Sequence, residues 1–554
     1  MPEKQPERIQ EGSSSGATRR DLLHVGNALV LPALLGGSQA MAANGPLRAG
    51  PEIYQSIGVE PVINCRGTFT IIGASVELPE VRVAMEHAAR YFVQLDELAA
   101  AVGQRFADLT GAEWGMVSAG CAAGLKHVTA ACVAGGNPEK LLRIPNLAGL
   151  DKTEVVAPRS SRSVYDHAIR NIGVKMITVD TAEELERALS PRTAMIYLSA
   201  GNATNAGPFA LENVARMAKP LGIPILVDAA AEGLTIPNVH LARGATVVAY
   251  SGGKAICGPQ CAGLLLGRKD LLQSAWQASS PHHGPGRDNK VGREETMGML
   301  AAVETWVKRD HEGEWKKWLS YLDTIAKKVS QVDGVKTAVR EPNGLSNKSP
   351  SLSISWDPAK LHITGEELAE ELARSKPRIA LGAGGGFRGE SAPERGSTSV
   401  SITAWMMQPG DDRIVADRLH AVLSQKRAPK AAPAAPASNI SGRWDVQVEF
   451  SSSKGQHTLV LEQDGNRLQG THKSEFAVQD VFGTIEGQEL KLQSTDRAPG
   501  DSITFLFVGA LAGDRMSGPL YMGEYLNAKF TATRHAYPTN RSKLLVPGGP
   551  PLAN

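Results

Sequence analysis

Residues 247–268, VVAYSGGKAICGPQCAGLLLGR, are the stretch that most clearly indicates the fold class of this chain. Two apolar runs, which we expect to be buried strands, enclose a glycine-rich turn that carries one lysine, Lys254. Burying an unpaired ammonium group is costly, so an ordinary core would not place an amine in this turn. A lysine that has to shed its proton and attack a carbonyl carbon benefits from such surroundings, because desolvation favours the uncharged amine. We therefore interpret Lys254 as a reactive lysine.

A second apolar run, PILVDAAA, lies upstream at 224–231 and includes Asp228 at the end of its strand. A strand that ends in aspartate, followed by a strand that leads into SGGK, is the arrangement that pyridoxal 5'-phosphate requires. The lysine holds this cofactor as a Schiff base, and the aspartate pairs with its pyridine nitrogen. Taken singly, Lys254 also fits a turn lysine and Asp228 also fits a helix cap. Together, and in order with the turn described next, they favour the cofactor.

Residues 116–125, MVSAGCAAGL, are interpreted as a strand that turns into a helix through small residues. Small residues let the backbone approach an anion, and a helix N-terminus offers free N–H groups and partial positive charge to a phosphate. The alternative is a tight turn without a ligand. We interpret Cys121 as a small filler rather than as a nucleophile. The predicted phosphate ligands are the backbone of Gly120, Cys121 and Ala122 and the hydroxyl of Ser251, with Ser118 a weaker candidate.

Length and composition bound the remaining possibilities. At 554 residues the chain is too long for one compact domain, and we expect two or three. A hydrophobic content of 42% and a charged content of 21% suit a globular protein with a full core. The formal net charge is +2, and no lysine–arginine block is dense enough to bind nucleic acid. The five cysteines form neither a metal-ligand pattern nor a disulfide framework, so we predict no metal site.

Short apolar runs alternate with helical stretches from residue 51 to about 424. This alternation predicts an α/β fold whose mainly parallel sheet is covered by helices on both faces. Ligands of such sheets bind beyond the carboxyl ends of the strands, where Asp228 and the lysine turn fall. We expect a cofactor-binding large domain at 51–330, one long helix at 294–332, and a small α/β domain at 331–424.

The C-terminal part of the chain has a different character. Residues 425–439, QKRAPKAAPAAPASN, form a proline- and alanine-rich linker that we expect to be extended. Residues 440–536 alternate apolar and polar positions between Asp-Gly, Glu-Gly and Gly-Asp turns, which predicts an all-β meander or small barrel. This segment resembles the lipocalin-like barrels appended to exported enzymes, and residues 537–554 are interpreted as a tail.

Residues 1–42 are interpreted as a removable leader. Arg19 and Arg20 precede an apolar run at 25–35, and AMA at 40–42 offers a cleavage site, as in a twin-arginine export signal. The run is too short to span a bilayer, so we expect no stable membrane span. The signal predicts a periplasmic or exported protein. The alternative is a disordered leader with a chance arginine pair, which would leave the protein in the cytoplasm.

The order of phosphate turn, strand aspartate and SGGK resembles the aspartate aminotransferase superfamily, the fold type I enzymes that use pyridoxal 5'-phosphate. Within it, the segments PVINCRGTFTIIGAS, LTGAEWGMVSAGCAAGL and KVGREETMGMLAAVE resemble the group of selenocysteine synthase, a seryl-tRNA selenium transferase. They resemble more closely its relatives of the D-glucosaminate-6-phosphate ammonia-lyase type. The resemblance covers residues 54–423. It implies that Lys254 forms the Schiff base, that Asp228 pairs with the pyridinium, and that Ala230 lies against one ring face.

The resemblance does not settle which residues contact the substrate. Many fold type I enzymes that act on free amino acids carry an arginine in a small-domain strand, where it clamps the substrate carboxylate. Here that strand reads SVSITAW, and Ser401 stands at that place, which disfavours ordinary transamination. A loop arginine is the alternative: Arg378, Arg388 or Arg395. The residue against the outer ring face also stays open; Tyr165 and His167 are near in sequence, and we expect His167 on the surface.

These observations predict a pyridoxal-phosphate-dependent lyase or transferase. The preferred activity is an α,β-elimination of the ammonia-lyase type on an amino-acid-like or amino-sugar-acid substrate, with Lys254 as general base. An aminotransferase or a selenium transferase-like enzyme is the alternative, and a cofactor-bound binding protein without turnover is an alternative of another class. The near-neutral charge and the leader disfavour tRNA as a substrate. The superfamily implies a homodimer or a higher homo-oligomer.

Overall fold

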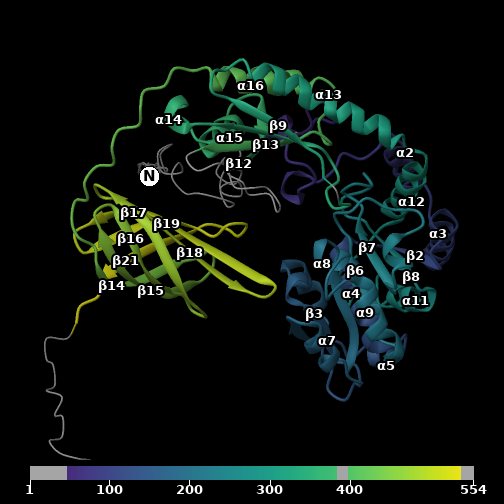
Figure 1. Ribbon diagram of the computed structural model, residues 1–554. Coiled ribbons are helices and arrows are strands. Elements are labelled where there is room, and N and C mark those ends of the chain that lie inside the picture. The colour runs from purple at the N-terminus through teal and green to yellow at the C-terminus, as the bar shows by residue number, and fades with distance from the viewer. Residues whose placement is uncertain (1–46, 343, 384–396, 538–554) are drawn as a thin grey trace, which may run out of the picture. The chain divides into compact units, whose positions relative to one another are not determined.

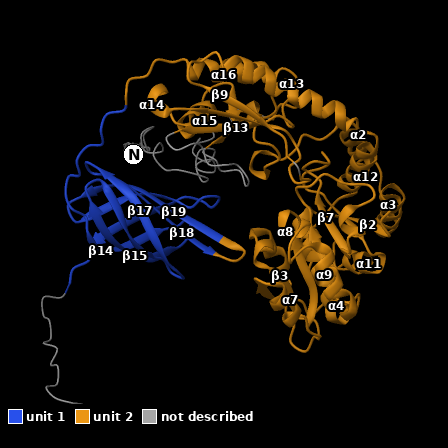
Figure 2. Ribbon diagram, viewed as in Figure 1, with its two compact units in different colours: residues 1–21, 430–497, 502–554 blue, residues 22–429, 498–501 orange. Residues whose placement is uncertain are grey.

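The computed structural model describes residues 47–342, 344–383 and 397–537. Within these residues the chain forms two compact units, one at 47–429 together with 498–501 and the other at 430–497 and 502–537 (Figure 2). None of the helices in the described part of the chain combines the length and hydropathy that a bilayer-spanning segment needs. The predictions for the leader at 1–42, for Arg388 and Arg395, and for the tail beyond residue 537 lie outside the described residues.

The first unit is built on a sheet of seven strands among the described residues (Figure 1). All neighbouring strands pair in parallel except β8, which runs antiparallel to both β2 and β7. The mainly parallel sheet predicted from the sequence is therefore confirmed. The strand order is β2 (Trp114–Ser118), β8 (Gly263–Gly267), β7 (Val247–Ser251), β6 (Ile225–Asp228), β5 (Thr193–Ser199), β3 (Glu154–Pro158) and β4 (Lys175–Val179).

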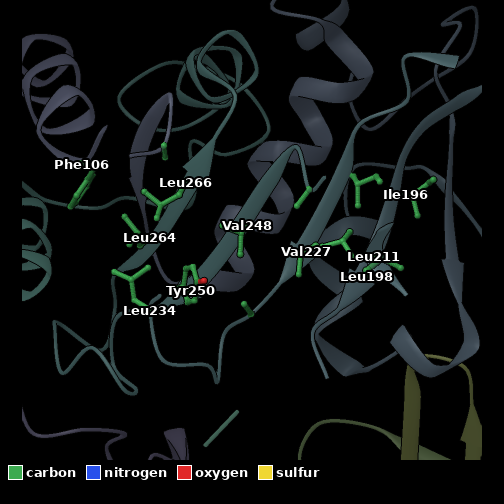
Figure 3. Packing of buried hydrophobic residues seen from close by; sticks show 14 of the residues in the cluster. Phe106, Ile196, Leu198, Leu211, Val227, Leu234, Val248, Tyr250, Leu264 and Leu266 are labelled. Carbon is green, nitrogen blue, oxygen red and sulfur yellow. The ribbon is translucent and has the colours of Figure 1, made fainter. Parts of the chain in front are cut away.

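Both faces of this sheet are buried, which explains why its strands read as continuous apolar runs. Successive residues of a strand point to opposite faces. Leu264 and Leu266 of β8 therefore join one apolar core, shown with Phe106 in Figure 3, whereas Leu265 joins the other. The first core includes residues of α3 (Leu95–Thr110), α9 (Leu211–Ala218) and α12 (Arg293–Lys308); the second includes residues of α4 (Cys121–Ala134), α6 (His167–Arg170) and α11 (Lys269–Gln277). The sheet thus has helices on both faces, as predicted.

A smaller antiparallel sheet follows in the same unit. Alternate residues of its strand β10 are buried, as in a sheet with one covered face. Its order is β12 (Gly382–Ala383), β13 (Thr398–Thr403), β10 (Ser351–Trp356) and β9 (Lys336–Arg340), and α13 (His311–Val329), α15 (Gly365–Arg374) and α16 (Asp411–Leu423) contribute to its core. Separately, β1 (Val62–Asn64) pairs in parallel with β11 (Arg378–Ala380), which attaches the N-terminal segment to this part of the unit.

The prediction of a single long helix at 294–332 is wrong. The structure has two helices, α12 and α13, separated by Arg309 in an extended conformation and by Asp310. The side chain of Asp310 accepts a hydrogen bond of 2.9 Å from the Gly313 N–H and so caps α13. Arg309 then reaches the lysine turn, where it donates to the Ala255 carbonyl at 3.2 Å. The helix break therefore allows Arg309 to contact the residue that follows Lys254.

The second unit contains a closed antiparallel barrel, which confirms the β-barrel predicted for residues 440–536. Buried and exposed residues alternate along its strands, as in β14, and the buried set forms a separate core that includes Trp444, Leu492 and Phe507. Closure removes the unpaired sheet edges that an open sheet would present. The strands are β14 (Gly442–Glu449), β15 (Lys454–Asp464), β16 (Arg467–Lys473), β17 (Val478–Glu486), β18 (Glu489–Ala498), β19 (Asp501–Ala512), β20 (Arg515–Tyr521) and β21 (Ala528–Arg534).

Ending the chain at Ala432, within the linker, is expected to leave a soluble fragment that still takes up the cofactor. The barrel has its own core and holds none of the predicted cofactor residues. Turnover of small substrates should stay within a few-fold, a change of about 1 kcal/mol or less in the barrier. Absorbance of the purified fragment and its kinetics measure both. If the fragment unfolds or takes up no cofactor, the barrel is part of the catalytic unit.

Candidate active site

The sequence-predicted site residues gather at one edge of the large sheet. Asp228 ends β6, Ser251 ends β7, and the turn with Lys254 follows. In the strand register Gly263, the first residue of β8, is the partner of both Ser251 and Ser118. The β2–α4 turn with Gly120 therefore lies at the same edge as the lysine turn. This is the carboxyl edge of the parallel strands, where α/β sheets bind their ligands.

Asp228 is half-buried, and donors surround its carboxylate. Oδ2 accepts a hydrogen bond from the Tyr197 hydroxyl at 3.1 Å, and Oδ1 accepts one from the Ala230 N–H at 3.0 Å. The Cys121 thiol lies 3.6 Å from Oδ1. Three groups thus orient one carboxylate at the strand end. Such a carboxylate suits a cationic partner, which a protonated pyridine nitrogen provides.

Tyr197 is the residue of this cluster that sequence reasoning missed. It lies on β5 with 0% of its surface exposed, and burial, followed by the charge of Asp228, raises its pKa well above the usual value. The hydroxyl therefore keeps its proton and donates to Asp228. A tyrosine inside an apolar strand was the available signal, because a buried hydroxyl needs a partner. The sequence did not reveal which partner that would be.

Cys121 also acts on Asp228 through its side chain. The pKa of the Cys121 thiol is raised well above its usual value, first by burial and second by the charge of Asp228. The charge of Lys254 lowers this pKa. The thiol therefore stays protonated, which argues against a nucleophilic role. Because both Asp228 and Lys254 affect this pKa, both charged groups lie near the Cys121 thiol.

The N-terminus of α4 fits a phosphate. Gly120, at φ 84°, is the N-cap, and no side chain caps the helix. Because the first turn of a helix has no intrahelical acceptors, the N–H groups of Cys121 and Ala122 are available to an anion. A Cβ on Gly263 would lie 2.6 Å from the Cys121 nitrogen, so β8 supports this turn at close range. Ser118 donates its hydroxyl to the Gly120 carbonyl at 2.8 Å and so holds the turn instead of facing a phosphate.

The lysine turn owes its shape to two glycines. A Cβ on Gly252 would lie 2.7 Å from the Ala262 carbonyl oxygen, and one on Gly253 would lie 2.7 Å from the Gln260 Cα. Lys254 follows them, half-buried. Its amine forms no ion pair within the residues that the structure describes. The close approach of backbone to backbone explains the two glycines of the SGGK pattern.

An N-terminal segment, 64–78, completes the surroundings of the lysine turn. The Ser75 N–H donates to the Gly253 carbonyl at 3.0 Å, and the Leu78 N–H donates to the Cys257 carbonyl at 3.2 Å. Sequence reasoning quoted this segment for its resemblance but gave its residues no role. The contacts join segments about 180 residues apart, which the sequence pattern could not indicate.

The remaining sequence candidates lie elsewhere. Tyr165 and His167 are both exposed, as expected for His167. Arg378 donates to the carbonyls of Ala373 at 2.8 Å and Glu60 at 3.2 Å, so its guanidinium joins the last turn of α15 to the segment before β1. Ser401 is buried between β10 and β12. The described part of the small sheet therefore offers no arginine at the predicted place.

Comparison with known proteins identifies the family of the chain. An aminotransferase class-V family model matches residues 166–291. D-glucosaminate-6-phosphate ammonia lyase of Salmonella typhimurium (strain 14028s / SGSC 2262) is 30% identical over 301 residues, which are 52% of this chain and 79% of that enzyme. A solved structure of a D-glucosaminate-6-phosphate ammonia-lyase superposes with a TM-score of 0.59 at 25% identity, over 67% of this chain and 98% of the other.

Two further curated relatives catalyse other reactions. 5'-C-glycyluridine monooxygenase-decarboxylase of Streptomyces sp is 29% identical over 341 residues, which are 59% of this chain and 83% of that enzyme. L-seryl-tRNA(Sec) selenium transferase of Hyphomonas neptunium (strain ATCC 15444) is 27% identical over 253 residues, which are 41% of this chain and 53% of that enzyme. Similarity at this level therefore extends over several chemistries.

Proposed function

Because this chain belongs to the aminotransferase class-V family of pyridoxal 5'-phosphate enzymes, close to D-glucosaminate-6-phosphate ammonia-lyase and seryl-tRNA(Sec) selenium transferase, we propose that it is an ammonia-lyase. Its proposed substrate is an amino-sugar acid or a similar amino acid with a β-hydroxyl group. The observation that carries the proposal is the Asp228 carboxylate, held by three donors at the same sheet edge as Lys254 and the α4 N-terminus.

The proposed roles are supported by the site geometry and by the family resemblance. Bound pyridoxal 5'-phosphate withdraws electrons from the carbon that carries the substrate amine. The backbone of Gly120, Cys121 and Ala122, with the Ser251 hydroxyl, binds the phosphate. Asp228 would hold a proton on the pyridine nitrogen, and Ala230 would lie against one ring face, as the resemblance implies.

Lys254 has the proton-transfer role in this proposal. Its Nζ accepts the proton from the substrate α-carbon and returns a proton to the departing β-hydroxyl group, which leaves as water. Hydrolysis of the dehydrated product then consumes one water and releases ammonia. The overall reaction therefore converts a 2-amino-3-hydroxy acid into a 2-keto-3-deoxy acid and ammonia. A relative that acts on D-glucosaminate 6-phosphate favours this substrate class.

Product analysis tests this activity. The purified holoenzyme is incubated with D-glucosaminate, its 6-phosphate and serine, without an added keto-acid acceptor. We expect ammonia and keto acid to appear in a one-to-one ratio with at least one of the hydroxylated substrates. Keto acid that forms only after an acceptor is added would indicate an aminotransferase. Spectral binding of all three compounds without any product would indicate a binding protein.

We also propose a homodimer or higher oligomer. Apolar side chains are exposed on the N-terminal segment and around α2 (Pro79–Ala88), among them Ile71, Val83, Tyr91 and Phe92, the last with 95% of its surface exposed. Exposed apolar patches of this kind mark interaction surfaces. Trp306, by contrast, packs within the chain, where its Nε1 donates to the Leu234 carbonyl at 2.9 Å. Sedimentation at micromolar concentration measures the mass.

Export through the twin-arginine route remains part of the proposal. It rests on Arg19, Arg20 and the apolar run that follows them. Cell fractionation after replacing both arginines by lysine separates a periplasmic or exported protein from a cytoplasmic one. Unchanged distribution would contradict the export signal.

A further inference from the structure

The proposed substrate carries a carboxylate, but its cationic partner is still missing. Fixing a carboxylate in a partly buried site calls for a guanidinium or ammonium group. Arg378 is engaged with backbone carbonyls, and Ser401 cannot supply charge. Arg309, beside the lysine turn, is already paired with the Glu314 carboxylate at 2.9 and 3.0 Å. Among the described residues, the carboxylate therefore needs a cationic partner on another element.

Arg66 lies on the segment that borders the lysine turn. The neighbouring residue Cys65 connects two strands of the small domain region: its N–H donates to the Ala380 carbonyl at 3.0 Å, and its carbonyl accepts from the Thr403 N–H at 2.9 Å. The Asn64 side chain accepts hydrogen bonds from the N–H groups of Arg66 at 2.9 Å and Gly67 at 3.1 Å. These bonds fix the backbone from which the Arg66 side chain extends.

The Arg66 guanidinium is partly buried without an anion. Its Nε is fully shielded from solvent and has no hydrogen-bond partner, and no carboxylate of the described chain pairs with it. The guanidinium lies 4.6 Å from the centre of the Phe69 ring, and burial lowers its pKa. Leaving a buried charge unpaired is costly. This cost is offset when an anion binds.

A second unpaired donor lies beside it. The Trp405 Nε1 is buried and has no hydrogen-bond partner among the described residues, with 8% of the residue exposed. A Cβ on Gly67 would lie 2.6 Å from this nitrogen, so the indole packs directly against the residue after Arg66. Trp405 also shares an apolar cluster with Cys257, against which Ala255 packs. The two donors are thereby connected to the turn that carries Lys254.

We propose that Arg66 binds the substrate carboxylate, in place of the small-domain strand arginine of other fold type I enzymes. The inference rests on the proposed function for the identity of the substrate. It assigns the carboxylate to the N-terminal segment rather than to β13. The same segment contacts Gly253, so carboxylate binding and the position of the lysine turn are coupled.

Two matched ligands test the assignment on the holoenzyme. D-glucosaminate carries the carboxylate, and 2-amino-2-deoxyglucitol has a hydroxymethyl group in its place. Binding of each is followed through the cofactor absorbance. We expect Arg66→Met to weaken D-glucosaminate binding about 100-fold, as for loss of one partner of a buried charge pair, and to change binding of the alditol less than two-fold. Arg66→Lys should lose about ten-fold, because it keeps the charge but not the paired geometry.

Succinate separates failure of this inference from failure of the proposed function. It has no amine and cannot be turned over, and calorimetry gives its affinity directly. Weaker succinate binding in Arg66→Met supports the assignment even if no amino-sugar acid is a substrate. Equal succinate affinity in wild type and Arg66→Met, or no carboxylate binding to the wild type, would overturn it. Arg192→Met, which removes an exposed arginine paired with Glu154, is the control.

Thermal unfolding distinguishes ligand binding from a structural role. A guanidinium without an anionic partner should be removable at little cost, so we expect Arg66→Met to unfold at or above the wild-type temperature in the absence of carboxylates. Succinate should raise the unfolding temperature of the wild type and not that of the variant. A variant that is destabilised and also binds both ligands equally less well would show that Arg66 is structural.

Discussion

Lys254→Ala is expected to lower turnover at least about 10³-fold and to abolish covalent attachment of the cofactor. The amine of Lys254 has two proposed tasks, attachment and proton transfer at the α-carbon, and proton transfer alone contributes up to about 10⁴-fold. The turn offers no replacement amine, because Gly252 and Gly253 precede Lys254 and Ala255 follows it. Borohydride reduction and peptide mass mapping should place the adduct on Lys254 in the wild type and find none in the variant.

Lys254→Arg separates the nucleophilic role from a purely electrostatic one. Arginine keeps the positive charge but cannot deprotonate in a protein, so this variant should be as inactive as Lys254→Ala. Lys175→Ala, at an exposed position on β4, serves as control and should keep both adduct and turnover. An adduct that persists on another lysine in Lys254→Ala would contradict the assignment.

Asp228→Asn is expected to lower turnover about 10²–10³-fold, the range found when one preorganised electrostatic partner is removed. Asparagine has nearly the same shape but no charge with which to hold a proton on the pyridine nitrogen. Steady-state kinetics and the absorption spectrum of the bound cofactor measure the effect. An unchanged spectrum and unchanged turnover in this variant would show that Asp228 does not pair with the pyridine nitrogen.

Tyr197→Phe should affect the cofactor indirectly, through the Asp228 carboxylate. It keeps the buried ring and removes the hydroxyl 3.1 Å from Asp228 Oδ2. Hydrogen bonds to charged groups contribute about 1.5–3 kcal/mol, so we expect at least a ten-fold loss of turnover and a shifted cofactor spectrum. Tyr250→Phe is the matched control: Tyr250 is equally buried, belongs to the core on the other sheet face shown in Figure 3, and accepts from the Asn238 amide at 2.7 Å. It should cost stability without changing the cofactor spectrum.

The order of the elements was accessible from the sequence because burial leaves a local pattern. A strand covered on both faces is buried along nearly its whole length and so reads as a continuous apolar run, as 247–250 and 264–266 do. The barrel was accessible for the same reason, since its strands alternate with period two. The boundary between α12 and α13 was not, because a helical pattern continues through Asp310 while the break depends on a side-chain cap and on an arginine that reaches Ala255.

The fold class and the cofactor could be predicted from the sequence alone, and the assignment of Lys254 and Asp228 to that cofactor is a prediction from the same local signals. These signals are local: a glycine turn, a strand end and a helix start each occupy a few consecutive residues. Only the tertiary structure shows that Tyr197 and Cys121 contact Asp228, that Arg378 binds backbone carbonyls, and that Arg66 has no anionic partner among the described residues. Those facts depend on strand order and register, which bring residues together across more than 30 and up to about 320 positions of the chain. A one-dimensional pattern records which side chains are buried, but not which side chains face one another.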